Sequence, residues 1–232
     1  MPEPRLTFLL DVDNTLLDND RAKADLAASL VDLLGQHAAG RFWELYEVVR
    51  TEQGMVNVPL TLARFEAEVG LTADANDDAV RRGRRFAVAD LVMSFPYADY
   101  LFPDALAAIA HLRELGRVAI LSDGDPTFQP SKIWRAGLDA AVDGAVLVFD
   151  HKEAHLDEVV AAFPADHYVL VEDKPELLTS VRGRLGSRLT TVLIRQGRYA
   201  ATVPFGSWEG ADLTLDRIGD LRDLQLADFW LG

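Results

Sequence analysis

Two aspartates, Asp11 and Asp13, stand one residue apart at the end of an apolar segment, Leu6–Val12. The segment is typical of a buried strand, and strands more often end in neutral turn-forming residues. Two carboxylates at the mouth of a sheet repel each other, and a metal cation between them offsets that repulsion. Alternatively, one carboxylate attacks as a nucleophile while the other carries protons. The pair therefore points to metal-assisted or carboxylate-based catalysis.

Three later apolar segments also end in polar residues. Because the carboxyl ends of parallel strands meet at one edge of a sheet, we expect these residues to converge with the aspartate pair. Such a mixture of acids, hydroxyls and amines suits Mg²⁺, which prefers oxygen ligands, and a phosphoryl group, which needs cations and hydrogen-bond donors. In chain order the residues are Ser122, Asp123, Gly124 and Asp125; Asp150, His151 and Lys152; and Glu172, Asp173 and Lys174.

Each of these features has an ordinary structural explanation when it is taken alone. An Asp-x-Asp pair is more often a turn or a helix cap, Ser122 can cap a strand, and Lys152 can be a solvated helix residue. Asp173 can cap the helix that begins near Pro175. Their order along the chain, each piece at or near the end of a predicted strand, favours a shared site.

Short, continuous apolar segments predict the strands of a parallel sheet that is covered on both faces. Helical segments separate the later strands, which favours right-handed βαβ units and a doubly wound, Rossmann-like α/β core. The predicted strands are Leu6–Val12, Val118–Ser122, Ala145–Phe149, Tyr168–Glu172 and Thr191–Ile194, and the predicted core helices are Pro103–Leu115, Ala154–Phe163 and Pro175–Leu185.

A long insert without a convincing strand separates the first strand from the second. Its amphipathic segments predict helices over Asp20–Leu34, Arg41–Glu52, Thr61–Val69 and Asp77–Met93. We therefore divide the chain into a core of residues 1–17 and 96–232 and an inserted α-helical cap domain of residues 18–95. A cap above the carboxyl ends of the strands would exclude water during chemistry.

These motifs, in this order, resemble those of the haloacid dehalogenase (HAD) superfamily over about residues 6–195. The run Asp-Val-Asp-Asn-Thr at 11–15 is similar to the first motif, and Ser122 to the second. Lys152 is similar to the third motif, and Glu172 with Asp173 to the acidic fourth. The insert lies where the family carries its helical C1 cap.

The resemblance implies Mg²⁺-dependent hydrolysis of a small phosphate monoester through a phosphoaspartate. Asp11 would be the nucleophile, and Asp13 the general acid and then the base. Mg²⁺ would be held by Asp11, the backbone carbonyl of Asp13 and Asp173.

The resemblance also implies a phosphoryl-binding set. Ser122 and the backbone N–H groups of Asp123 and Gly124 would hold the phosphoryl oxygens, and Lys152 would neutralise the phosphate and orient the nucleophile. The acid at Asp13 favours the phosphatases of the family, because its dehalogenases and its phosphonate-cleaving branch lack an acid at this position.

Three alternatives stay open at this point. They are a phosphorylatable signalling or binding module, a family member that binds phosphate ligands without turnover, and a sugar phosphomutase. Leu177 stands where the family has a further acid or Asn, so whether Glu172 or Glu176 assists the metal is also open. Lys132 is the rival of Lys152 for the third motif, and its position in the sequence favours Lys152.

Two further groups are interpreted as ordinary surface features. His151 and His155 are interpreted as surface histidines, because no third metal ligand has suitable spacing. The run Arg-Gln-Gly-Arg at 195–198 is interpreted as a turn.

Composition limits the class of protein. The 232 residues carry a net charge of −14, so we expect neither nucleic acid nor an anionic membrane as a partner. Cysteine is absent, which fits a reducing compartment, and the N-terminus lacks the basic start and apolar run of a signal peptide. We expect a cytoplasmic protein that acts on a small phosphorylated substrate.

Overall fold

A six-stranded parallel sheet forms the centre of the computed structural model, which describes residues 5–72, 78–203 and 208–230. The strands lie in the order β3-β2-β1-β4-β5-β6, which is the order of a Rossmann-like doubly wound sheet. The predicted α/β fold class is therefore confirmed. The strands are β1 (Leu6–Leu10), β2 (Arg117–Asp123), β3 (Val146–Phe149), β4 (His167–Glu172), β5 (Leu189–Ile194) and β6 (Leu213–Leu215).

Strand β1 lies inside the sheet, and its register brings the polar strand ends together. Leu10 pairs with Ile120 of β2 on one side and with Val171 of β4 on the other. Just beyond β1, the N–H group of Asp11 donates to the carbonyl of Val171 at 3.0 Å. Asp11 is therefore level with the last residue of β4 and lies two residues short of the end of β2.

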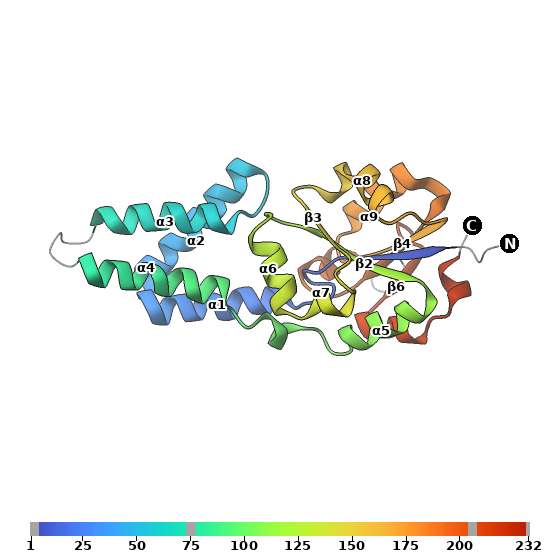
Figure 1. Ribbon diagram of the computed structural model, residues 1–232, viewed down its shortest axis with the longest axis horizontal. Coiled ribbons are helices and arrows are strands. Elements are labelled where there is room, and N and C mark those ends of the chain that lie inside the picture. The colour runs from blue at the N-terminus through green and yellow to red at the C-terminus, as the bar shows by residue number, and fades with distance from the viewer. Residues whose placement is uncertain (1–4, 73–77, 204–207, 231–232) are drawn as a thin grey trace.

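Both faces of the sheet are buried, which explains why the strands are apolar without alternation. Phe8 and Leu10 belong to one hydrophobic cluster, whereas Leu9 between them belongs to the other. Helices α8 (Leu156–Ala162) and α9 (Pro175–Leu185) lie on one side of the sheet and α5 (Ala105–Leu115) on the other (Figure 1). Burial of apolar surface on both faces is the main source of stability for such a sheet.

Four helices form one end of the elongated molecule (Figure 1). The predicted insert helices are all present, although α2 begins five residues earlier than expected, directly after Gly35 (φ 79°). The limits of the cap domain at 17/18 and 95/96 stay a prediction. The four helices are α1 (Asn19–Leu34), α2 (Gln36–Gln53), α3 (Val58–Thr72) and α4 (Asp78–Met93).

Short helices complete the fold. Helix α6 (Phe128–Arg135) follows β2 and lies between the cap helices and the sheet (Figure 1). Helix α7 covers Leu138–Ala141. Turns of 3₁₀ helix cover Tyr97–Tyr100, Lys152–Ala154, Gly186–Arg188, Arg198–Thr202, Ile218–Asp223 and Leu226–Phe229.

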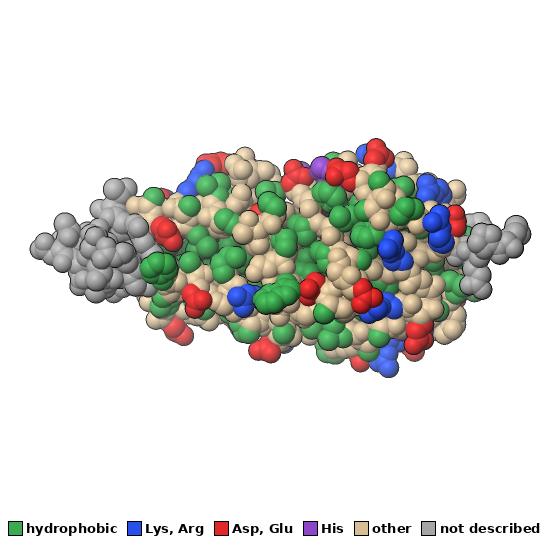
Figure 2. Space-filling view, viewed as in Figure 1, with side chains coloured by type: hydrophobic (Ala, Val, Ile, Leu, Met, Phe, Trp, Pro, Cys, Tyr) green, Lys and Arg blue, Asp and Glu red, His purple; other side chains and the backbone are tan. Residues whose placement is uncertain are grey.

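The surface is acidic, and its charges are dispersed. Figure 2 shows acidic side chains along the whole of one face, over the cap helices and the sheet alike, in keeping with the net charge of −14. Among the described residues, no helix has the length and apolarity needed to span a bilayer.

Candidate active site

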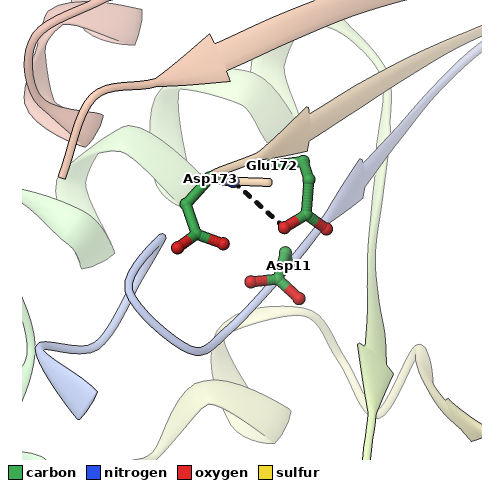
Figure 3. Close-up of side chains that lie close together, drawn as sticks. All are labelled: Asp11, Glu172 and Asp173. Atoms are coloured by element: carbon green, nitrogen blue, oxygen red, sulfur yellow. Dashed lines mark hydrogen bonds between the residues drawn. The ribbon is translucent and has the colours of Figure 1, made fainter. Parts of the chain in front are cut away.

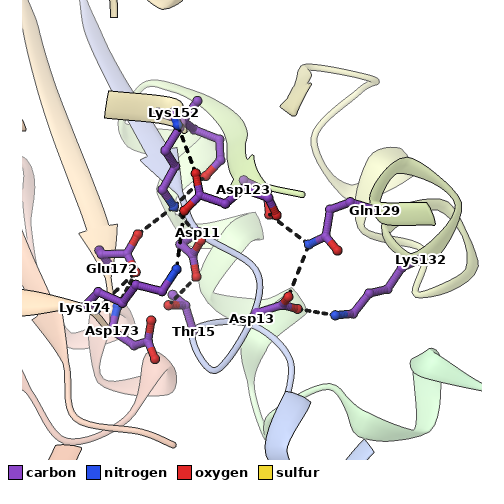
Figure 4. Close-up of polar contacts among 12 residues, drawn as sticks. Asp11, Asp13, Thr15, Asp123, Gln129, Lys132, Lys152, Glu172, Asp173 and Lys174 are labelled. Atoms are coloured by element: carbon purple, nitrogen blue, oxygen red, sulfur yellow. Dashed lines mark hydrogen bonds and ion pairs between the residues drawn. The ribbon is translucent and has the colours of Figure 1, made fainter. Parts of the chain in front are cut away.

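Lys152 lies at the centre of the predicted site and is fully buried. Its Nζ is 2.5 Å from Asp11 Oδ1, 2.6 Å from Glu172 Oε2 and 3.2 Å from the carbonyl oxygen of Leu121 (Figure 4). The ammonium group thus donates to Asp11 and to the Leu121 carbonyl and forms an ion pair with Glu172. Lys152 therefore joins the first and fourth motifs through their acids.

Lys132 has a different partner from Lys152. This side chain comes from α6, is 3% exposed, and pairs with Asp13 Oδ1. It also donates to Asn19 Oδ1, at the start of cap helix α1, at 2.8 Å. The two lysines are thus not alternatives for one position, because each aspartate of the first motif has its own lysine.

Gln129 is a site residue that the sequence analysis did not single out. Its Nε2 donates to Ser122 Oγ at 2.9 Å and to Asp13 Oδ2 at 3.4 Å (Figure 4). Gln129 stands three positions before Lys132 and therefore on the same side of helix α6. That spacing, one turn before a lysine already under consideration, is the signal that would have found it.

Gly124 makes room for Gln129. Its φ is +155°, and a Cβ built on it would come within 2.6 Å of Gln129 Cβ. Its N–H group donates to the carbonyl of Phe149 at 2.8 Å and so extends the sheet. This contact differs from the predicted phosphate-binding role of Gly124, which requires a free N–H group.

Asp123 faces the loop that carries Lys152. Its Oδ1 accepts the backbone N–H of Lys152 at 2.9 Å, and its Oδ2 lies 3.4 Å from Lys174 Nζ. The side chain thus links the second motif to the third and fourth motifs. Whether its own N–H group binds a phosphoryl oxygen stays a prediction.

Three buried carboxylates meet where β1 and β4 end. Oxygens of Asp11, Glu172 and Asp173 lie within 4.8 Å of one another, and the three carboxylates are grouped at the strand ends (Figure 3). Glu172 Oε1 accepts the N–H groups of Asp173 and Lys174, both at 3.1 Å. Both carboxylate oxygens of Asp173 are buried without a hydrogen-bond partner.

The charges in this cluster are unevenly balanced. Burial, with the charges of Asp11 and Glu172, raises the pKa of Asp173 to about 10. Burial and Glu172 also raise the pKa of Asp11 to about 6, although Lys152 and Lys174 oppose this. Burial acts against ionisation of Glu172 as well, but the same two lysines lower its pKa to about 2. Of the three carboxyl groups, Asp173 is thus the one whose side chain has neither an ion pair nor a hydrogen-bond partner among the described residues.

The cluster fits a divalent metal ion. Buried carboxylate oxygens without hydrogen-bond partners are costly unless a cation binds them, and an all-oxygen donor set suits Mg²⁺. Glu172 belongs to the cluster, whereas Glu176 is outside it and lines a neighbouring surface hollow. The side chain of Asp13 is not among the clustered carboxylates of the described residues, so its predicted contact rests on its backbone carbonyl.

The loop after β3 holds the two histidines apart from the acid cluster. The ring of His155 stacks on Phe149 with centroids 4.5 Å apart and contacts Asp150 and Glu158. His151 is exposed and lines the edge of the neighbouring cavity. Neither ring contributes to the carboxylate cluster.

A cavity of about 270 Å³ lies between the cap helices and the strand ends. Its core side includes Asp13, Asp123 and Lys174, while its cap side includes Trp43 and Tyr46. Arg198, interpreted from the sequence as part of a turn, also lines it and begins a 3₁₀ helix. Asp11 is only 2% exposed and is shielded from solvent.

A family profile and a solved structure relate this chain to the same group of proteins over most of its length. Residues 6–193 match the sequence profile of the haloacid dehalogenase-like hydrolases. A Burkholderia xenovorans LB400 protein described as such a hydrolase is 40% identical, with a TM-score of 0.80 over 96% of this chain and 100% of that chain. A comparison with functionally curated proteins finds no match.

Two more distant structures share the fold. The HAD-hydrolase YfnB from Bacillus subtilis, bound to magnesium, is 15% identical, with a TM-score of 0.58 over 95% of this chain and 98% of that chain. The L-2-haloacid dehalogenase from Xanthobacter autotrophicus, with chloropropionic acid covalently bound, is 17% identical, with a TM-score of 0.54 over 94% and 96% of the two chains. With the profile match over most of its length, the chain belongs to the haloacid dehalogenase-like hydrolases.

Proposed function

We propose that the protein hydrolyses phosphate monoesters of small molecules in a Mg²⁺-dependent reaction through a phosphoaspartate at Asp11. The observation that carries this proposal is the position of Asp13, which lines the cavity and is held by Lys132 and Gln129. An alcohol that leaves from a phosphate ester needs a proton, and a carboxyl group in this position can donate one. A leaving halide needs no proton, so a dehalogenase has no use for this acid.

The first step transfers the phosphoryl group to the protein. A carboxylate oxygen of Asp11 forms a bond to phosphorus as the bond from phosphorus to the ester oxygen breaks. Asp13 gives its proton to that oxygen. Lys152 and the hydroxyl of Thr15, which donates to Asp11 Oδ2 at 3.1 Å, hold the nucleophile in one orientation.

The second step releases phosphate. Asp13, now a carboxylate, takes a proton from water, whose oxygen bonds to phosphorus while the bond to Asp11 breaks. Mg²⁺, held by Asp11, Glu172 and Asp173, would offset the repulsion between the phosphate and the attacking carboxylate. Shielding of Asp11 from solvent strengthens each of these electrostatic contacts.

Ser122 supports phosphoryl binding through its hydroxyl hydrogen. Gln129 donates to Ser122 Oγ at 2.9 Å, so the serine accepts that bond, and its own O–H makes only a long contact of 3.5 Å with the carbonyl oxygen of Asp123, which it could exchange for a better acceptor. A phosphoryl oxygen is a suitable acceptor. Lys174, on the cavity wall, adds positive charge beside it.

Activity on two kinds of substrate tests this proposal. The wild-type protein should release phosphate from p-nitrophenyl phosphate in Mg²⁺, and EDTA or Asp11→Asn should abolish the release. It should release no chloride from 2-chloropropionate. Chloride release without phosphate release would overturn the proposal in favour of a dehalogenase.

The remaining alternatives have their own signatures. A mutase needs a bisphosphate activator, whereas a hydrolase turns over without one. A signalling module would accept one phosphoryl group per chain and stop, and a binding protein would form no phosphoenzyme. Multiple turnovers with water alone support hydrolysis over all three.

A further inference from the structure

Three cationic side chains gather at the cap side of the cavity. Lys23 and Arg50 come from helices α1 and α2, and Arg198 comes from the segment after β5, so three separate parts of the chain supply them. Lys23 is half-buried, and the two arginines are exposed. In a protein with a net charge of −14, such a grouping is unusual.

These three cations have few anionic partners. Glu47 is 3.5 Å from Lys23 and 3.2 Å from Arg50, so two cations share one exposed carboxylate. The guanidinium of Arg198 donates only to the hydroxyl of Tyr199, at 3.3 Å, and forms no ion pair within the described part of the chain. Its backbone N–H group, not its side chain, binds Asp20. Within the described part of the chain, both ion pairs that these cations form therefore end on the single carboxylate of Glu47.

The described acids that line the cavity form no ion pair with these three cations, although the charge of Asp20 acts on Arg198. Asp13 pairs with Lys132, Asp123 accepts from Lys152 and Lys174, and Asp125 accepts the N–H groups at the start of α6. Asp20 accepts the N–H of Arg198, and Asp150 accepts from the loop after β3.

The cations are also close to one another electrostatically. Burial lowers the pKa of Lys23, and the charges of Arg50 and Arg198 lower it further, while Glu47 opposes them. Burial, with the charges of Asp13 and Glu47, raises the pKa of Tyr46 to about 12, against the effect of the same arginines. The charge of Asp13 and the charges of Arg50 and Arg198 therefore all act on Tyr46.

The cavity that Asp13 and the cations share also has aromatic side chains in its wall. Lys23 Nζ lies 4.3 Å from the centroid of the Tyr46 ring and 5.1 Å from that of Trp43. A cavity of about 270 Å³ suits a small molecule, since drug-sized ligands occupy about 300–1,000 Å³. The leaving group of a substrate would therefore run from Asp13 along these rings toward the cations.

We propose that Lys23, Arg50 and Arg198 form a subsite for a second anionic group, so that the substrates are small phosphate monoesters that carry a carboxylate or a further phosphate. This inference rests on the proposed function for the position of the phosphoryl group, but the subsite itself follows from the charges and the cavity. Arginine and lysine bind either anion by charge-assisted hydrogen bonds.

Paired substrates test the subsite. In the first pair, 3-phosphoglycerate has a carboxylate where glycerol 3-phosphate has a hydroxymethyl group. In the second pair, fructose 1,6-bisphosphate has a second phosphate that fructose 1-phosphate lacks. The wild-type protein should prefer at least one anionic member, and the two pairs distinguish carboxylate from phosphate. Arg50→Met and Arg198→Met should each lower kcat/KM for that member about tenfold, and for the neutral member less than about threefold.

Two further variants sharpen the test. Glu47→Gln removes the carboxylate shared by Lys23 and Arg50, and it should raise kcat/KM for the anionic substrate by up to about fivefold. Arg64→Met is the matched control, because Arg64 pairs with Glu52 in the cap but does not line the cavity. Thermal unfolding of every variant checks that the fold is kept.

Binding separates this inference from the proposed function. Calorimetry with the Asp11→Asn protein in Mg²⁺ measures affinity for each pair without turnover. If the wild-type protein hydrolyses none of these esters, the proposed function is overturned for this substrate class, while tighter binding of the anionic members still supports the subsite. The subsite would be overturned if the arginine variants lowered kcat/KM equally for both members of each pair. It would also be overturned if both members bound with equal affinity.

Discussion

Lys152 follows Asp11 by 141 positions in the chain, yet its Nζ lies 2.5 Å from Asp11 Oδ1 inside the protein. The same ammonium group contacts Glu172, so one cation serves two buried carboxylates. Removing one partner of a buried ion pair leaves the other charges uncompensated, which costs about 3–5 kcal/mol. The contact is therefore important for stability as well as for chemistry.

Lys152→Met should lower the melting temperature strongly. A loss of about 3–5 kcal/mol corresponds to about 6–20 °C in a chain of this size. Thermal unfolding in EDTA measures the loss, and Lys132→Met is the matched control, because its partner Asp13 is partly exposed. Equal shifts in the two variants would contradict this account of the buried pairs.

Asp13→Asn should slow release of phosphate more than formation of the phosphoenzyme. Without a base to activate water, the steady-state rate should fall by about 10²–10⁴-fold. Rapid-quench experiments with labelled phosphate measure the phosphoenzyme, which should accumulate with an activated ester. Fast release of phosphate from the variant would contradict the role of Asp13 as the base that activates water.

Lys132→Met should act through the orientation of Asp13. The loss in kcat should reach about tenfold with an alkyl phosphate and stay below about threefold with p-nitrophenyl phosphate, whose leaving group needs little protonation. Arg135→Met on the same helix is the control, and Lys132→Arg should restore part of the rate. Equal losses with both esters would indicate a merely structural role for Lys132.

Asp173→Asn should abolish the rise in melting temperature that we expect Mg²⁺ to cause. At 100 times its dissociation constant a ligand stabilises a protein by about 2.7 kcal/mol, or about 5–11 °C here. Wild-type protein should show this rise and Asp173→Asn should not. Glu176→Gln should keep it, since Glu176 lies outside the acid cluster. An unchanged response in Asp173→Asn would contradict the metal assignment.

Gly124→Ala should disturb Gln129. The added Cβ would come within 2.6 Å of Gln129 Cβ, so Gln129 must release Ser122 or Asp13. We expect kcat/KM to fall at least about tenfold, the scale of one charge-assisted hydrogen bond. Gly183→Ala, where the new methyl group meets nothing within 4 Å on helix α9, should keep activity and gain about 0.5–1 kcal/mol.

The fold was largely predictable because its strands are buried on both faces. Runs such as Val118–Ser122 and Tyr168–Glu172 are continuous and apolar, and each lies within an observed strand. Strand β6 was missed because it has three residues, all only half-buried, at the edge of the sheet. So short an edge strand has too little apolar sequence to stand out.

The sequence predicted the positions of site residues only where the path of the backbone alone determines them. Asp11, Ser122 and Glu172 converge because strand ends in a parallel sheet must converge. The contacts of Gln129 and Lys132 with Asp13 depend on side-chain directions across more than 100 positions of sequence. The three-residue spacing places Gln129 and Lys132 on one side of a helix but does not show that this side faces Asp13, and so the second lysine was weighed as a rival of the first.

The position of β1 in the sheet also bears on how the protein forms. Its partners β2 and β4 begin at residues 117 and 167, so a nascent chain carries β1 unpaired while the intervening residues are synthesised. The cap helices, by contrast, contact neighbours along the chain and can assemble early. The carboxylate of Asp11, the proposed nucleophile at the end of β1, thus acquires its surroundings only after residue 172 has been added. During synthesis, we expect the cap to fold before the active site exists.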